Sequence, residues 1–440
     1  MRQTVGTVKG SCQSVRMSVY EQERGFFVMG KKRNIIVGQS GGPTAVINSS
    51  LAGVYKTAKE RGFHKVYGML HGIEGFLDEM YVDLSAQIHS DMDIELLKRT
   101  PSAFLGSCRF KLPEIHENPE IYEKIFSIMN KLEIEVFIYI GGNDSMDTIK
   151  KLSDYAIVKG HEQKFLGVPK TIDNDLALTD HTPGFGSAAK YIAASTKEVI
   201  RDAMGLSYKR KMITIMEIMG RNAGWLTGAT ALAKTEDCCG PDLIYLPEIP
   251  FDVDRFLKKC SDLLEKKPSI VIAVSEGIKV PDGRYVCQLA GGSDYVDAFG
   301  HRQLAGTAGY LASFLAAKTG CKTRAVELST LQRSASHMAS RVDINEAFMV
   351  GGAAVKAADE GDSGRMVVID RVSDDPYMSA AGIYDVHKIA NNEKLVPRSW
   401  VNREGNYVTR EFIDYVEPLI QGDYQPFMVN GLPQHLVLKR

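Results

Sequence analysis

Short apolar runs recur along the chain from Asn34 onward and alternate with longer stretches that have a helical period. Most of the runs contain few polar positions, which is typical of strands buried on both faces of a parallel sheet. We expect such strands at residues 34–38, 136–140, 164–169, 212–218, 269–276, 323–329 and 366–370.

The stretches between these runs predict helices. Residues 121–132 place their apolar side chains on one helical face: Ile121, Ile125, Ile128, Met129 and Leu132. Further helices are expected at 45–61, with Pro43 near the first turn where proline is tolerated, and at 408–420. The alternation of strands and helices predicts an α/β fold with mostly parallel sheets and helices on both faces.

The composition is that of a folded protein. A length of 440 residues suits two or three compact units, and the 44% hydrophobic and 24% charged residues exclude wholesale disorder. The 53 basic and 54 acidic residues leave a formal charge of -1, so no overall positive field attracts nucleic acid or an anionic membrane. We expect neither partner, and any binding of anions must be local.

The seven cysteines have no CxxC or Cys/His spacing, which fits a reducing compartment. The adjacent Cys238 and Cys239 are expected to be free thiols, because neighbours seldom reach disulfide geometry. No stretch approaches the roughly 20 apolar residues that cross a bilayer, and no secretion signal is evident. We therefore expect a cytoplasmic protein, with residues 1–30 as a flexible extension outside the fold.

Two glycine-containing loops follow predicted strands, where open α/β sheets bind their ligands. The first is Gly41-Gly42-Pro43, and the second is Gly141-Gly142-Asn143-Asp144-Ser145. Backbone N–H groups at such a strand-to-helix junction can face an anion. The oxygens of Asn143 and Asp144 suit Mg²⁺. A tight turn in the first loop and a helix cap in the second are the structural alternatives.

The segment Pro169-Lys-Thr-Ile-Asp-Asn-Asp175 places a lysine, a hydroxyl and two carboxylates directly after a predicted strand. One carboxylate can accept a hydroxyl proton, and the second can hold metal-bound water. The ammonium can neutralise a phosphate during its transfer. A solvated turn is the alternative.

Further charged residues stand close to the remaining predicted strands. Arg221 and Glu276 follow two of them, and Arg324 and Arg333 bracket a third. An arginine there could bind a phosphate through two parallel hydrogen bonds. A surface salt bridge would have the same appearance in the sequence.

In this order and at these strand ends, the segments resemble the phosphofructokinase family, from about Asn34 to Arg371. The resemblance implies two Rossmann-like three-layer domains with the active site in the cleft between them. It assigns 31–184 plus about 333–390 to a domain that binds the phosphoryl donor. It assigns 185–332 plus about 391–440 to a domain that binds fructose 6-phosphate.

The resemblance also assigns roles to individual residues. Gly42 is similar to the glycine that contacts the donor, and Arg109 to the arginine that supports the transferring phosphate. Asp173 is similar to the catalytic base. The positions that resemble the sugar-phosphate site are Thr171, Asp173, Asp175, Met219, Gly220, Arg221, Glu276, Arg324, Thr330 and Arg333.

The donor is expected to be pyrophosphate. Family members that use ATP have glycine at the positions of Asp144 and Lys170, whereas members that use pyrophosphate have Asp and Lys as here. Asp144 would occupy the space of the ATP α-phosphate and repel it, and Lys170 would add positive charge near pyrophosphate. Both residues join Asp173 and Arg109 as expected catalytic residues.

Three positions depart from the family pattern. Asn143 stands where most relatives have a metal-binding aspartate, so Mg²⁺ is expected at Asn143 and Asp144 through an amide oxygen, water or the carboxylate. Thr330 replaces a sugar-phosphate histidine of the ATP-using members. Met212 replaces an arginine that reaches across from a neighbouring subunit; the basic run 209–211 could substitute or be a solvated surface.

The resemblance implies reversible transfer of a phosphoryl group from pyrophosphate to the 1-hydroxyl of fructose 6-phosphate by a homodimer or homotetramer. An ATP-dependent 6-phosphofructokinase and a non-catalytic subunit that senses sugar phosphate are the alternatives. A Rossmann-type dehydrogenase is a third, but neither glycine loop has the GxGxxG spacing.

Overall fold

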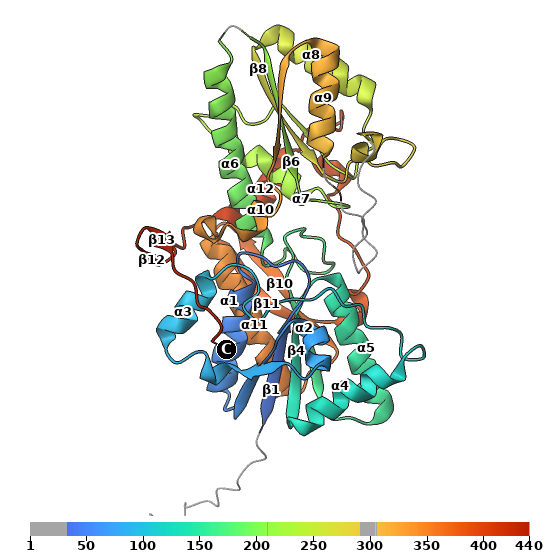
Figure 1. Ribbon diagram of the computed structural model, residues 1–440, viewed down its shortest axis with the longest axis vertical. Helices are drawn as coiled ribbons and strands as arrows, with labels where there is room; N and C mark the ends of the chain where they lie inside the picture. Colours follow the sequence, from blue (N-terminus) through green and yellow to red (C-terminus); the bar gives the residue numbers. More distant parts are fainter. Residues whose placement is uncertain (1–32, 209, 291–303, 305, 440) are drawn as a thin grey trace, which may run out of the picture. The chain divides into compact units, whose positions relative to one another are not determined.

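Two β-sheets with flanking helices organise the part of the chain that the computed structural model describes, residues 33–208, 210–290, 304 and 306–439 (Figure 1). The expected extension 1–30 and Lys209 lie outside the described residues. A short hairpin, β12 (Met428–Val429) with β13 (Leu432–Pro433), lies close to the end of the described chain.

The larger sheet has the strand order β11-β10-β5-β4-β1-β2-β3. Its five inner strands are parallel, and the two edge strands pair antiparallel. The strands are β1 (Asn34–Gln39), β2 (Lys65–Met69), β3 (Tyr81–Asp83), β4 (Ile134–Gly141), β5 (Lys164–Pro169), β10 (Arg365–Asp374) and β11 (Tyr377–Asp385).

Helices cover both faces of this sheet because successive strand residues point to opposite sides. Ile35 and Val37 of β1 pack with α1 (Ile47–Glu60) and α11 (Arg341–Glu360). Ile36 between them packs with α4 (Pro119–Lys131) and α5 (Asn143–Lys159). The result is a three-layer arrangement, as expected from the sequence.

The smaller sheet has the order β7-β8-β6-β9 and is wholly parallel. Met216 of β6 faces α6 (Phe185–Leu206) and α7 (Trp225–Ala229), whereas Ile215 faces α8 (Val253–Lys266) and α9 (Thr307–Thr319). The strands are β6 (Met212–Ile218), β7 (Leu243–Tyr245), β8 (Ser269–Ser275) and β9 (Lys322–Glu327).

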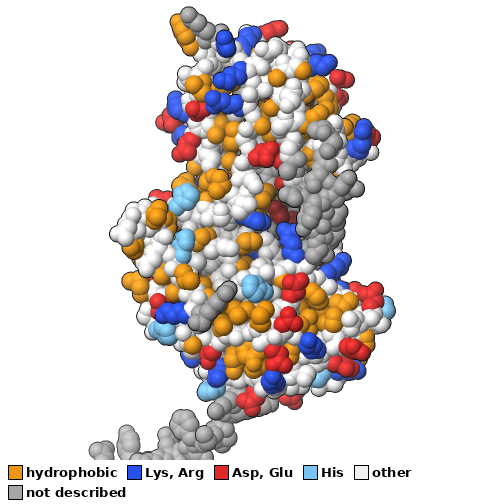
Figure 2. All heavy atoms as spheres, viewed as in Figure 1, with side chains coloured by type: hydrophobic (Ala, Val, Ile, Leu, Met, Phe, Trp, Pro, Cys, Tyr) orange, Lys and Arg blue, Asp and Glu red, His pale blue; other side chains and the backbone are white. Residues whose placement is uncertain are grey.

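The remaining helices connect or flank these layers. They are α2 (Gly72–Leu77), α3 (Asp91–Arg99), α10 (Leu331–Ser334) and α12 (Arg410–Val416), with 3₁₀ turns between elements. No helix of the described residues is long and apolar enough to cross a membrane. In Figure 2 basic and acidic side chains intermingle over the visible face, in keeping with the near-zero net charge.

The α/β class and the mostly parallel sheets are confirmed, and each of the seven expected strands is present. Two helical expectations need correction. The first helix begins at Ile47, so Pro43 precedes it and is not in its first turn. The helix expected at 408–420 is α12 followed by a 3₁₀ turn at Glu417–Ile420. The domain boundaries stay a prediction.

Candidate active site

The loops that follow β1, β4 and β5 are joined by backbone hydrogen bonds. Ser40 N donates to Ile140 O at 2.9 Å, and Lys170 N donates to Gly141 O at 3.0 Å. Gly41 N donates to Cys108 O at 3.0 Å. Neighbouring parallel strands end at one edge of the sheet, and these bonds hold their loops together there. The arrangement brings the glycine loop at Gly41, the segment before Arg109 and the start of α5 into one site.

Lys170 is the most informative residue of this site. Its side chain is buried, with 3% of the residue exposed, and Nζ donates to the carbonyl oxygen of Gly42 at 2.7 Å. Burial lowers the pKa of Lys170 to about 8, although Asp173 and Asp175 act to raise it. A buried cation against a glycine loop is suited to an anionic ligand.

Arg333 approaches the same loop from α10. A Cβ atom on Gly42 would lie 3.2 Å from Nη1 of Arg333. Nε of Arg333 is buried and has no hydrogen-bond partner within the described residues. Burial, together with the charge of Arg109, lowers the pKa of Arg333. The guanidinium thus has a donor to offer to a phosphate oxygen.

Asn143 and Asp144 lie in the first turn of α5, directly after the glycines that end β4. Oδ1 of Asn143 is buried without a hydrogen-bond partner in the described chain. Nowhere in the described chain do three His, Cys, Asp or Glu side chains form a metal-binding group. An amide oxygen and one carboxylate fit Mg²⁺ that takes its other ligands from phosphate and water.

The loop after β5 carries the predicted base. Thr171 Oγ1 accepts a hydrogen bond from Asp173 N at 3.0 Å and lies 3.4 Å from its Oδ2. Burial raises the pKa of Asp173, while Lys170 and the Thr171 hydroxyl act to lower it. Burial and the charge of Asp173 raise the pKa of Asp175 to about 7. Two neighbouring part-buried carboxylates with raised pKa values suit proton transfer.

The smaller sheet adds residues to this cluster. Glu276 follows β8, and burial together with the charge of Asp173 raises its pKa to about 7. The charge of Arg221, which follows β6, acts on both Glu276 and Asp173. Met219 donates its N–H to Oε1 of Gln332 at 3.1 Å, and Gly220 has a φ of 148°. The strand ends of both sheets therefore contribute to one electrostatic site.

One predicted residue, Arg324, lies apart from this cluster, and another, Thr330, has an exposed side chain. Arg324 is in the middle of β9 opposite Thr214, roughly 15 Å along the strands from Met219. Its Nη1 pairs with Asp202 of α6 at 2.9 Å, and 39% of its side chain is exposed. Thr330 is exposed at the start of α10. Their roles in the sugar-phosphate site stay predictions.

Sequence reasoning missed the residues that hold the catalytic loop. Asn174 is fully buried with a φ of 55°, accepts from Thr182 N at 3.0 Å and donates to the hydroxyl of Tyr415 at 2.9 Å. Asparagine tolerates this left-handed conformation better than most residues. Its place between two carboxylates was the one available signal. Gln332, which accepts the hydrogen bond from Met219 N, was also missed. No sequence signal marks it, because a polar residue in a short helix is common.

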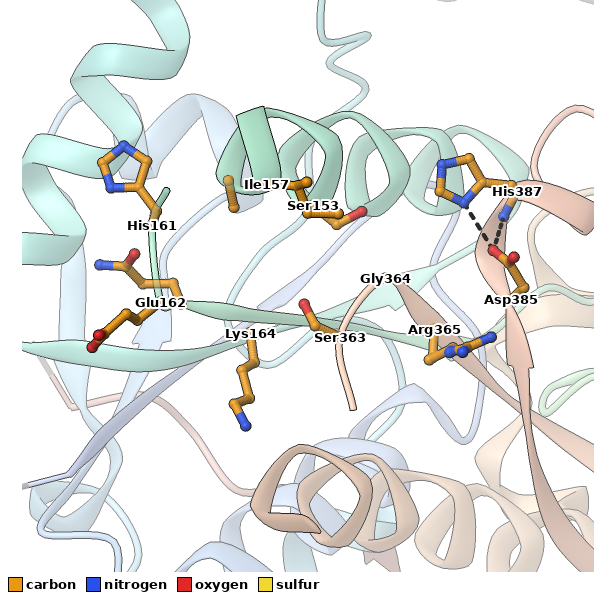
Figure 3. Close-up of a pocket in the computed structure, with 12 residues that line it drawn as sticks. Ser153, Ile157, His161, Glu162, Lys164, Ser363, Gly364, Arg365, Asp385 and His387 are labelled. Carbon is orange, nitrogen blue, oxygen red and sulfur yellow. Dashed lines mark hydrogen bonds and ion pairs between the residues drawn. The ribbon is translucent and has the colours of Figure 1, made fainter. Parts of the chain in front are cut away.

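A separate pocket of about 330 Å³ lies at the opposite end of β5 (Figure 3). Lys164, which begins β5, lines it, whereas Lys170 follows the last residue of that strand. Ile157 of α5 and the pair His387 and Asp385 also line the pocket. The pocket is thus distinct from the cluster around Asp173.

The doubly covered, mostly parallel sheets and the glycine loop beside a buried lysine suit an enzyme that transfers phosphoryl groups. A profile of the family described as Phosphofructokinase matches residues 34–358. The chain belongs to this family.

Relatives match nearly the whole chain. The pyrophosphate–fructose 6-phosphate 1-phosphotransferase of Halomonas elongata is 39% identical over 405 residues, which cover 92% of this chain and 95% of the relative. The protein of the same name from Xanthomonas campestris is 40% identical over 407 residues, with coverage of 92% and 96%. The crystal structure of the pyrophosphate-dependent phosphofructokinase of Nitrosospira multiformis is 36% identical, covers 93% of this chain and 97% of its own, and has a TM-score of 0.84.

Proposed function

We propose that the protein reversibly transfers a phosphoryl group from pyrophosphate to the 1-hydroxyl of fructose 6-phosphate, giving fructose 1,6-bisphosphate and phosphate. The observation that carries the proposal is the buried ammonium of Lys170, bound to the Gly42 carbonyl beside the start of α5. The names of the two relatives support the same reaction.

In the proposed mechanism, Asp173 accepts the proton of the sugar 1-hydroxyl while that oxygen attacks phosphorus in line. Thr171 orients the carboxylate through the contact at 3.4 Å. Lys170, Arg109 and Arg333 spread the negative charge of the transferring group. Positioning and electrostatic stabilisation therefore provide most of the catalysis.

The donor preference follows from the residues beside the glycine loops. Asp144 puts a negative charge at the start of α5, where it would repel the α-phosphate of ATP, and Lys170 adds a positive charge for the shorter donor. The effect of Lys170 is strengthened by its burial, because screening by water is weak there.

Phosphofructokinases generally use a divalent metal, and we propose Mg²⁺ for this protein. Asn143 and Asp144 would hold it, and when bound it would neutralise charge on the donor phosphates. The support is the unpartnered buried oxygen of Asn143. The proposed site of action is the cytoplasm, since Cys108, Cys238, Cys239, Cys260 and Cys321 are free thiols. A homodimer or homotetramer stays a prediction.

A donor assay tests the proposed reaction. Purified protein with fructose 6-phosphate and Mg²⁺ should have a kcat/KM for pyrophosphate at least about tenfold that for ATP. A tenfold ratio is the effect expected of one modest charge–charge interaction. A higher value with ATP would contradict the donor assignment. Binding of fructose 6-phosphate without turnover of either donor would instead support a sensing subunit.

The pKa shifts predict a narrow pH optimum. Asp175 and Glu276 lose their negative charge below about pH 7, and Lys170 loses its positive charge above about pH 8. The kcat/KM for pyrophosphate should therefore peak between these values and fall on both sides. A Lys170→Gly variant should lack the basic limb that the lysine causes, and its residual profile reports the ionisation of pyrophosphate itself. Identical basic limbs in both proteins would exclude Lys170 as the cause.

A further inference from the structure

His181 is buried in the loop after β5, and both of its ring nitrogens contact carboxylates. Nδ1 lies 2.8 Å from Oδ1 of Asp180, and Nε2 lies 2.6 Å from Oε2 of Glu346 on α11. A carboxylate accepts hydrogen bonds, so both nitrogens carry protons and the ring is an imidazolium. Burial opposes this charge, but Glu346 and Asp180 raise the pKa of His181 to about 9.

The surrounding groups complete a balanced set of charges. Arg371 of β10 donates to Oδ1 of Asp180 at 3.0 Å, and Oε1 of Glu346 accepts from Tyr377 and Ser379 of β11 at 2.6 Å each. The two carboxylates are thus matched by two cations, and the oxygens of Glu346 are hydrogen-bonded. Removing one member would leave an uncompensated buried charge, which is strongly unfavourable. The other ionisable groups that face this set are Asp343, Lys394, Tyr415 and the exposed Asp374, whose Oδ1 lies 3.1 Å from Nη1 of Arg371.

Thr182, the residue after His181, is hydrogen-bonded to the loop that carries Asp173. Thr182 donates its hydroxyl to Thr171 O at 2.8 Å and its N–H to Oδ1 of Asn174 at 3.0 Å. These two bonds are made to the loop on either side of Asp173. The position of Thr182 is in turn fixed by its neighbour His181, whose ring is held between Asp180 and Glu346 of α11.

We propose that His181 is a positioning residue for the phosphoryl transfer, and that the Asp180–His181–Glu346 clasp fixes the loop that presents Asp173 to the substrate. Because His181 is only 1% exposed, it acts through Thr182 and Asn174 and not by direct contact with a substrate. Without the clasp, the loop can move away from α11, and Asp173 loses its fixed geometry beside Thr171 and Lys170. The effect on activity rests on the proposed function, whereas the effect on the loop does not.

The kinetic test compares two histidines that each bridge two carboxylates. His181→Gln removes the buried charge and should lower kcat about 10- to 100-fold, with KM for both substrates within about threefold, as small misplacements of catalytic groups do. The acidic limb of the profile should move to lower pH, because a looser loop admits water and burial is what most raises the pKa of Asp175, one of the two carboxylates that cause this limb. Partial unfolding would instead lower the activity by the same factor at every pH and would leave the limbs of the pH profile in place.

The control is His387→Gln. His387 bridges Asp385 and Asp154 at 2.8 and 2.9 Å on the surface, with 43% of its side chain exposed (Figure 3 shows the Asp385 contact). This variant should keep its kcat and its pH profile. An equal loss in both variants would overturn the positioning role.

Amide hydrogen exchange tests the loop without using activity. The amides of Asp173 and Thr182 should exchange at least about tenfold faster in His181→Gln than in the wild type or in His387→Gln, since local opening exposes both. Glu346→Gln keeps the side-chain shape and should give a smaller change of the same sign if His181→Gln does not fold. Unchanged exchange with unchanged kcat would overturn the proposal. A wild type that does not use pyrophosphate would refute the proposed reaction alone.

Discussion

Replacing Asp173 by alanine should lower kcat by a factor of about 10³ or more, since a positioned general base contributes about 10² to 10⁴. The carboxylate is part-buried beside Lys170 and Thr171, and neither an ammonium nor a hydroxyl is a base of similar strength that could replace it. KM for both substrates should change much less than kcat, because the proton is transferred only during reaction. Steady-state kinetics in the forward direction measure both values.

An Asp173→Ser variant should show a loss of the same order, because a hydroxyl is a poor base at neutral pH. Asp282→Ala is the matched control, since Asp282 is an exposed surface carboxylate paired with Arg284. Its kcat should remain that of the wild type. An Asp173→Ala enzyme with more than about a tenth of the wild-type rate would remove Asp173 from the role of base.

The second large effect is expected for the donor. The double change Asp144→Gly with Lys170→Gly should allow ATP to be used and should weaken the use of pyrophosphate, so that the ratio of the two kcat/KM values changes by about 100-fold or more. A change of this size corresponds to about 2.7 kcal/mol, which is reasonable for two charges in a buried site. Initial rates with each donor at saturating fructose 6-phosphate give the ratio.

The single variants separate the two contributions. Lys170→Gly alone should mainly raise KM for pyrophosphate, because the cation beside Gly42 that is expected to bind pyrophosphate is lost. Asp144→Gly alone should mainly relieve the repulsion of ATP. A double variant that keeps the wild-type preference would show that these positions do not choose the donor.

Strands such as β1, β4, β5 and β8 could be predicted because each is a largely apolar, buried run. The strand β2 was missed although it is buried and parallel. Two other missed strands lack an apolar run for physical reasons. In β11 exposed and partly buried residues alternate, since it pairs antiparallel at the edge of its sheet. The strand β7 has three residues, too few for any period. The start of α1 was misplaced because Pro43 suggested a first turn that the chain delays until Ile47.

The site residues close to strand ends could be predicted because sequence places them directly after apolar runs. The residues that support the loop could not, because their partners come from distant segments. The bond between Asn174 and Tyr415 joins residues 241 positions apart, and that between His181 and Glu346 joins residues 165 apart. Folding brings them together, and no local pattern marks them. Arg324 was predicted from its proximity to a strand, but it lies in the middle of β9.

The glycine pair at the end of β1 has a consequence for engineering. A Cβ atom on Gly41 would stand 3.3 Å from Nζ of Lys170, and one on Gly42 would stand 3.2 Å from Nη1 of Arg333. Gly41 also has a φ of 75°, whereas Gly42 has a backbone that any residue adopts. At Gly42, therefore, glycine is suited because it leaves room for the guanidinium of Arg333. Even a methyl group there would crowd the guanidinium, so alanine scanning of this loop would perturb charges that belong to other segments.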